Sequence, residues 1–239
     1  GISRVTLSPD LIEERSESWS TSINYDRPFN KFIIGFTLEA FRTSLKNAFF
    51  LQPNGADDFG LLFEKQNGQG AIVEGLTFEL RSNYNRKVQL ESGYTIQTNE
   101  FQNPVAYIDG VPPITRFIRT PNDYGFAVLT LNPNEHFSLN LNYVYTGSML
   151  VPHFSGAPNQ TTDEIVDVDS FSNLSFRFSY AMVIKKSKMI FEWYAGIKNI
   201  LNEYQDNFDV GKNRDSNFVF GPAQPRTIFG GVKIRSGKL

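Results

Sequence analysis

The side chains best suited to catalysis or metal binding are few in this chain and widely separated. There are two histidines, His136 and His153, and no cysteine. Zinc sites and histidine-based catalytic triads need several such residues close together. His136 adjoins an expected turn and His153 lies in an expected loop, so a surface role is the stronger hypothesis for each. We predict no catalytic, cofactor-binding or metal-binding residues, and an enzyme is the least favoured class.

An acidic run is the second candidate for chemistry. It contains Asp163, Glu164, Asp167 and Asp169, and calcium prefers carboxylate oxygens. The spacing does not match an EF-hand loop, and no glycine stands at the turn position. A solvated loop is therefore the favoured interpretation, and whether 163–169 binds calcium stays open. The Asn-Gly-Gln-Gly run at 67–70 lacks the Gly-Lys-Ser/Thr ending of a phosphate-binding loop.

Aromatic residues in the expected loops form a third group, which would bind a ligand rather than transform it. These residues are Phe49, Phe50, Phe101, Tyr107, Phe117, Phe154, Phe218 and Phe220. They could line a ligand vestibule, or they could pack against neighbouring loops. The sequence does not separate the two, so the ligand-binding residues remain unassigned.

Alternating apolar and polar residues predict the strands that carry these loops. The clearest example is 137–145, where Phe, Leu and Tyr alternate with Ser and Asn. The composition agrees, because 22 Phe and 10 Tyr favour strands. We predict an all-β chain of nine antiparallel strands, at 19–25, 31–45, 60–83, 88–97, 124–131, 137–145, 173–184, 189–198 and 226–234. The third would be one long strand, bulged near Asn67-Gly68.

The connections between these strands alternate in length. Short ones are expected at 26–30, 83–87, 132–135 and 185–188, and long ones at 46–58, 99–121, 146–170 and 200–225. Short periplasmic turns with long external loops, joined by strands of about ten residues, are typical of transmembrane β-barrels. No apolar run approaches 18 residues, which excludes a helical membrane protein. A net charge of −2 gives no case for nucleic acid.

The two faces of the predicted sheet differ in the way a barrel wall requires. Tyr143, Tyr145, Tyr180 and Trp193 lie near expected strand ends, where aromatic girdles occur. The opposite faces carry charges that suit a polar lumen, namely Glu39, Glu79, Arg81, Glu91, Arg177, Glu192 and Lys198. The alternative is a secreted β-sandwich that binds carbohydrate or a surface partner, because sandwiches also alternate apolar and polar residues.

The C-terminal part of the chain resembles a known family. Its segments KNILNEYQD (198–206) and FGPAQPRTIFGGVKI (220–234) are similar to the end of TonB-dependent outer-membrane receptors. The matching residues are Asn199, Leu201, Asn202, Gly221, Pro222, Pro225 and Arg226. The segment YTGSMLVPHF at 145–154 also resembles the family. The chain departs from it at the end, where Ser-Gly-Lys-Leu replaces the usual terminal aromatic.

The resemblance implies a 22-stranded barrel in the outer membrane, filled by a plug domain. Nine strands would then be the C-terminal segment of that barrel, without the plug. The last strand, 226–234, should pair with a first strand that lies outside this chain. The implied function is uptake of a scarce nutrient driven by TonB, with an iron–siderophore complex or cobalamin as the usual cargo and import of a sugar or peptide as the other alternative. The resemblance is greatest to receptors of the Bacteroidetes type. The implied partners are the plug, TonB, the nutrient ligand and outer-membrane lipid.

Overall fold

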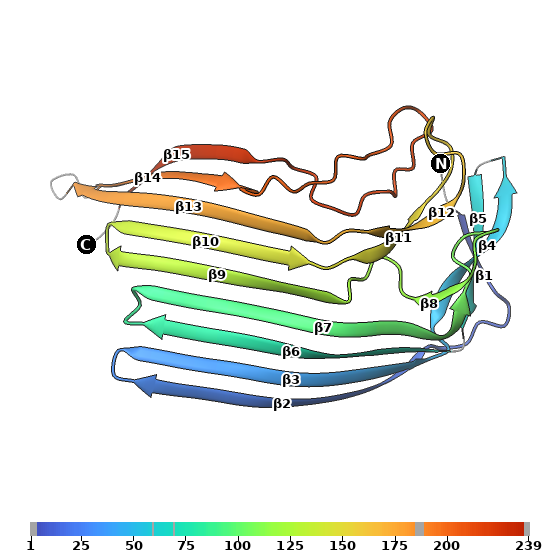
Figure 1. Ribbon diagram of the computed structural model, residues 1–239, viewed down its shortest axis with the longest axis horizontal. Coiled ribbons are helices and arrows are strands. Elements are labelled where there is room, and N and C mark those ends of the chain that lie inside the picture. Colours follow the sequence, from blue (N-terminus) through green and yellow to red (C-terminus); the bar gives the residue numbers. More distant parts are fainter. Residues whose placement is uncertain (1–3, 59, 69, 185–188, 237–239) are drawn as a thin grey trace.

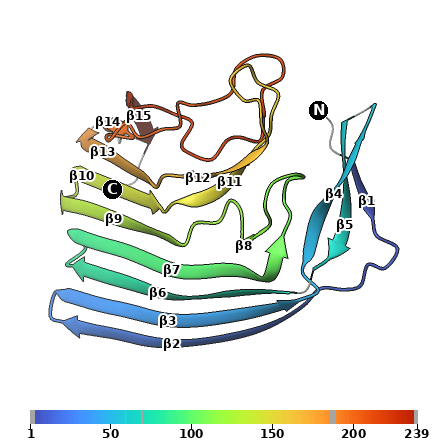
Figure 2. The same ribbon diagram turned by 45° about the vertical axis from the view of Figure 1, so that its right-hand side comes forward.

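A computed structural model of the chain describes residues 4–58, 60–68, 70–184 and 189–236. Nine strands follow one another across an antiparallel sheet of ten, which is strongly curved (Figure 1, Figure 2), and the tenth is a short strand described with the loops below. In order across the sheet they are β2 (Arg15–Phe29), β3 (Phe32–Lys46), β6 (Ala71–Tyr84), β7 (Val88–Val105), β9 (Asp123–Asn134), β10 (Phe137–Thr146), β13 (Phe171–Ile184), β14 (Met189–Lys198) and β15 (Thr227–Ser236). The nine predicted strands of an open barrel wall are therefore confirmed.

No helix that is long and apolar enough to span a membrane occurs in the described part of the chain.

The register of the strands sorts apolar and polar side chains onto opposite faces. On β13, Phe178 lies between Leu139 of β10 and Ala195 of β14, whereas the next residue along, Arg177, lies between Asn140 and Gly196. Successive residues of a strand point to opposite sides, so each alternating segment supplies one row to each face. The apolar face stays uncovered: Leu76 is 56% exposed and Ile96 is 57% exposed.

This uncovered face shows that the sandwich alternative is wrong. A sandwich buries the apolar face of one sheet against a second sheet. Here the nine strands form a single sheet, and the buried apolar side chains of the described residues all lie at the loop end of the molecule. They are Ala48, Ala71, Val105, Ile108, Met149, Val151, Ala157, Val168 and Phe218.

The polar face carries the charged residues that the sequence assigned to it, and several are paired. Arg81 lies 3.3 Å from Glu79 and 3.5 Å from Asp26, measured between side-chain nitrogen and oxygen atoms. Arg177 lies 3.1 Å from Glu192. All seven predicted charges share this face in the strand register, so a barrel built from this wall has a polar interior.

Aromatic side chains mark both ends of the apolar face, as predicted. Tyr180 lies opposite Phe137 and Trp193 near the turn end of the sheet, while Tyr145 lies near the loop end. Phe137 and Tyr145 are eight residues apart on one strand, which corresponds to about 27 Å along the strand. A tilt of about 40° reduces this to about 21 Å, close to the height of the apolar band of membrane barrels.

The connections alternate as expected, with turns at one end of the sheet and long loops at the other (Figure 1). The described turns are centred at 30–31, 85–87 and 135–136. The predicted turn at 185–188 lies outside the described residues. The prediction of a turn over 26–30 is wrong in part, because Asp26 to Phe29 continue β2. Pro28 lies opposite Ile33 of β3 in this extension of β2.

The predictions for two adjoining segments are wrong because one of the loops contains strands of its own. The predicted strand 60–83 divides into β5 (Gly60–Asn67) and β6, and the expected loop 46–58 contains β4 (Phe49–Asp57). β5 pairs with β4 and β1 (Arg4–Leu7) in a separate three-stranded sheet at the loop end (Figure 2). The chain changes direction near Gly70, whose φ of 126° excludes most side chains.

The other long loops are also partly ordered. β7 continues to Val105, inside the expected loop 99–121, and β8 (Ile114–Arg116) pairs with it. The expected loop 146–170 contains a hairpin of β11 (Met149–His153) and β12 (Glu164–Val168). The connection 199–226 has no regular strands, in agreement with the prediction. These segments together surround the candidate site.

Candidate ligand-binding site in the outer loops

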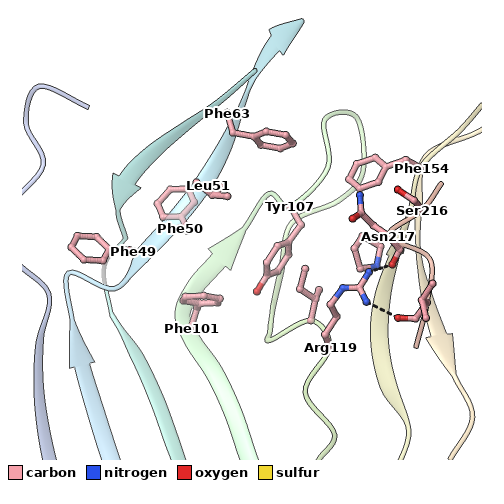
Figure 3. A pocket seen from close by; sticks show the side chains of 13 residues that line it. Phe49, Phe50, Leu51, Phe63, Phe101, Tyr107, Arg119, Phe154, Ser216 and Asn217 are labelled. Carbon is pink, nitrogen blue, oxygen red and sulfur yellow. Dashed lines mark hydrogen bonds between the residues drawn. The ribbon is translucent and has the colours of Figure 1, made fainter. Parts of the chain in front are cut away.

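A cavity of about 640 Å³ lies among the loops at the open end of the wall. The β4–β5 hairpin forms one side, and the segment around Asn217 forms the other, with Phe101 and Tyr107 between them (Figure 3). Five of the eight aromatic residues singled out in the sequence line it: Phe49, Phe50, Phe101, Tyr107 and Phe154. Their convergence from three separate loops supports the vestibule interpretation for these five.

The other three aromatic residues pack within the loops, as the alternative interpretation required. The ring of Phe117 lies against Phe101, with 4.5 Å between ring centroids. The ring centroids of Phe218 and Phe220 are 5.1 Å apart, and both rings pack in a cluster with Met149 and Val151. The vestibule interpretation therefore holds for five of the eight aromatic residues, and the packing interpretation holds for the other three.

Arg119 is the cavity residue that sequence reasoning missed. Its backbone adopts a left-handed conformation with φ of 56°, and its amide donates to the carbonyl of Leu150 at 2.7 Å. The guanidinium donates to the carbonyls of Val219, at 3.0 Å, and of Asn217, on the side of the cavity opposite the β4–β5 hairpin (Figure 3). Among the described residues no carboxylate lies within 4.0 Å of it. Its positive charge therefore has no carboxylate partner among these residues, and it can attract an anionic ligand.

Tyr107 adds a neutral polar group to the cavity. Burial raises the pKa of Tyr107 to about 12, and its hydroxyl donates to the carbonyl of Arg116 at 3.4 Å. The ring lies 6.3 Å from that of Phe101, measured between centroids. Tyr107 therefore stays protonated at neutral pH. The site combines flat apolar surfaces with one cation, Arg119, and with the polar side chains of Tyr107, Ser216 and Asn217, an arrangement suited to holding a ligand.

A buried histidine–aspartate pair fixes the loop that supplies the far wall. His153 Nε2 lies 3.0 Å from Asp209, and the His153 ring stacks on Phe218 with 3.6 Å between centroids. Burial acts to raise the pKa of Asp209, but hydrogen bonds from the Asp215 amide and from His153 outweigh it and lower that pKa. The prediction of a surface position is wrong for His153, which is 8% exposed. His136 lies at an exposed turn, as predicted.

The acidic run is spread along the β11–β12 hairpin. Asp163 accepts a hydrogen bond from the Ser155 amide at 2.7 Å, and Glu164 accepts one from Gln160 at 3.2 Å. Asp167 belongs to β12, opposite Leu150. No group of three metal-ligating side chains occurs in the described ranges. Gln69, within the 67–70 run, lies outside those ranges.

The wall and its loops match a known architecture. Residues 3–200 fit the sequence model of the family described as TonB dependent receptor-like, beta-barrel. The chain belongs to this family. A TonB-dependent receptor is a transport receptor of the outer membrane, so the predicted resemblance is confirmed at that level. The match ends at residue 200, and the motifs at 220–234 lie beyond it. A search among curated proteins found no match.

Several solved structures share the fold. The ferric-catecholate import receptor Fiu of E. coli K12 superposes with a TM-score of 0.61 at 18% identity, over 92% of this chain and 27% of that one. The FrpB iron transporter of Neisseria meningitidis gives 0.57 at 12% identity, over 97% and 33%. The siderophore receptor PiuA of Acinetobacter baumannii gives 0.57 at 15% identity, over 91% and 28%. The chain thus spans about a third or less of these receptors.

Proposed function

We propose that this chain forms part of the wall and the outer ligand site of a receptor that imports a ferric siderophore across the outer membrane. The observation that carries the proposal is the aromatic cavity with Arg119 at its edge. Family membership supports transport, and the similar structures described as iron or siderophore receptors support the cargo. Cobalamin, the other cargo implied by the resemblance to receptors of the Bacteroidetes type, is the alternative.

The chemistry of the cavity favours a flat, anionic ligand. A cavity of about 640 Å³ is in the range that holds a compact small molecule or one arm of a larger one. Aromatic rings bind planar groups face on, and a guanidinium binds paired oxygen atoms through two parallel donors. Iron-chelating catecholates have both properties. We therefore place such a group against Phe101 and Tyr107, with its oxygen atoms toward Arg119.

We further propose that the nine strands are the C-terminal segment of the barrel of a longer receptor. The outer edges of β2 and β15 have no neighbouring strand among the described residues. Lipid cannot satisfy free backbone groups, so a wall in the membrane needs further strands at both edges. In this proposal the whole receptor closes the barrel, a plug domain fills its polar interior, and TonB acts on that plug from the periplasm.

Uptake by cells that express the whole receptor tests the function. We expect accumulation of radioactive iron from a ferric catecholate, and none of labelled cobalamin. Arg119→Ala should reduce binding of the ferric catecholate by roughly 10- to 100-fold, the range for losing a charge-assisted hydrogen bond. Arg214→Ala is the matched control, because Arg214 lies on the 199–226 loop but outside the cavity lining. Unchanged uptake with Arg119→Ala would refute the placement of the ligand, and cobalamin uptake would refute the cargo.

A further inference from the structure

A second cavity lies behind one wall of the first, between the β11–β12 hairpin and the 199–226 loop. It measures about 400 Å³. His153 and Phe218 line this second cavity, whereas the residues on either side of each of them line the first. Those flanking residues are Pro152, Phe154, Asn217 and Val219. The two cavities are therefore separated by a thin partition, in which the rings of His153 and Phe218 stack with 3.6 Å between centroids.

The second cavity differs from the first in charge. The polar side chains that line it are His153, Asn159, Gln160, Glu164, Asn207 and Asp209. Among the described residues of its lining there is no lysine or arginine, whereas the first cavity contains Arg119 and no carboxylate. A ligand of the second cavity therefore meets two carboxylates instead of a guanidinium. This disfavours an anionic ligand of the kind proposed for the first cavity.

His153 contributes a ring nitrogen that has no partner. Its side chain is 10% exposed, and its Nε2 lies 3.0 Å from Asp209. An ionised carboxylate only accepts hydrogen bonds, so Nε2 carries the ring hydrogen and Nδ1 of the neutral ring is an acceptor. Within the described parts of the chain, Nδ1 makes no hydrogen bond. A ligand that donates a hydrogen bond would satisfy this buried ring.

Glu164 adds a second acceptor on the same side of the hairpin. It lies directly opposite His153 in the β11–β12 register, and side chains at such positions are neighbours on one face. Its Oε1 accepts a hydrogen bond from Gln160 at 3.2 Å, and its Oε2 accepts none from the described residues. The cavity therefore offers an imidazole nitrogen and a carboxylate oxygen as neighbouring free acceptors.

We propose that the second cavity binds the primary ammonium group of a small amine. An ammonium group has three donors, no acceptor and a positive charge, which match the Nδ1 atom of His153 and the carboxylate of Glu164. The lining also includes Val166, Phe208 and Val210, which provide an apolar surface for a short hydrocarbon chain. This inference is independent of the ligand proposed for the first cavity.

Saturation-transfer NMR on the whole receptor in detergent tests the inference, with detergent micelles alone as the blank. The probe is n-butylammonium at neutral pH, and n-butanol is its uncharged counterpart. We expect saturation of butylammonium and not of butanol. Glu164→Gln removes the charge and keeps the shape, so it should weaken butylammonium binding by roughly tenfold or more, as the loss of a charge-assisted hydrogen bond does. Asp167→Asn is the matched control, because Asp167 lies on the same strand but outside the lining.

Two further measurements identify the source of the ammonium group and the role of the imidazole. A blocked Gly-Lys-Gly peptide that binds more tightly than butylammonium would assign the site to a lysine side chain, and weaker binding would assign it to a free amine. His153→Phe keeps an aromatic ring against Phe218 but removes both nitrogen atoms, so butylammonium binding should be lost. If this variant does not fold, Glu164→Gln alone decides.

The outcomes separate this inference from the proposed function. Equal saturation of butanol, or butylammonium binding that Glu164→Gln leaves unchanged, would overturn the ammonium site. Glu164 lines only the second cavity, so iron uptake should be the same with Glu164→Gln as with the unaltered receptor. Loss of the ammonium site would therefore leave the transport function standing.

Discussion

Substitution of Phe218 should destabilise the outer loops without affecting the strands of the wall. Phe218 is 3% exposed, stacks on His153, and packs against Phe220 within the cluster that includes Val151. Replacing a buried Phe by Ala costs about 3–5 kcal/mol. We take about 3 kcal/mol, because loops can partly collapse into the space. That loss raises the equilibrium constant for local opening of 199–226 by roughly 150-fold.

Hydrogen exchange measured on the whole receptor by mass spectrometry tests this estimate. Phe218→Ala should lower the protection of 199–226 by about two orders of magnitude, while β9, β10 and β13 keep theirs. Binding of the ferric siderophore should weaken as well, because Asn217 and Val219 hold Arg119 in place. Phe208→Ala is the control, since Phe208 is on the same loop and is 37% exposed. Unchanged protection of 199–226, or equal loss of protection in the strands, would refute the reasoning.

Three further predictions concern the same region. The pKa of Asp209 is lowered below its ordinary value of 3.8. Its contribution to loop stability is therefore complete above about pH 4 and is lost as the pH falls through the lower folded-state pKa. Limited proteolysis of 199–226 should accelerate only below that pH, and acceleration already at pH 6 would contradict this. Gly70→Ala should destabilise the fold by about 1–3 kcal/mol, because φ is 126° and the Cβ would lie 2.6 Å from the Leu45 carbonyl. Gly55→Ala, where nothing lies within 4 Å, should cost less in a thermal melt, and equal losses would contradict the steric argument. Arg119→Lys keeps the charge but loses the planar pair of donors, so iron uptake should fall less than with Arg119→Ala. Equal uptake by the two variants would show that the charge at this position has no role.

The strands of the wall could be predicted from the sequence because successive residues of a β-strand point to opposite faces, so apolar and polar residues alternate with a period of two. Phe137 to Tyr145 follows that period except at Val144, which is apolar in the polar row, and the structure has β10 at that place. The prediction was wrong at 60–83, where only β6 alternates regularly and β5 belongs to a different sheet. The break depends on the conformation of Gly70, and a glycine in a strand pattern predicts a bulge as readily as a change of direction.

The sequence predicted which type of residue lines the candidate site, but not which individual residues line it. Aromatic residues in long loops indicated a vestibule, and five of the eight line the cavity. Arg119 gave no signal, because its role depends on carbonyl groups 98 and 100 residues away in the sequence. His153 was misplaced for a related reason. Only the return of the 199–226 loop, which carries Asp209 and Phe218, buries it.

The positions of the buried residues imply that the wall and the loops are stabilised by different means. The sheet has hydrogen-bonded strands and an apolar face that stays exposed among the described residues. The loops have a small core of their own around Met149, Val151 and Val168, closed by Phe218. Because this core does not include the strands of the wall, substitutions in the cavity lining that leave the core intact should alter ligand preference without unfolding the wall. The two kinds of surface can therefore change separately, which is what a receptor wall that serves different ligands requires.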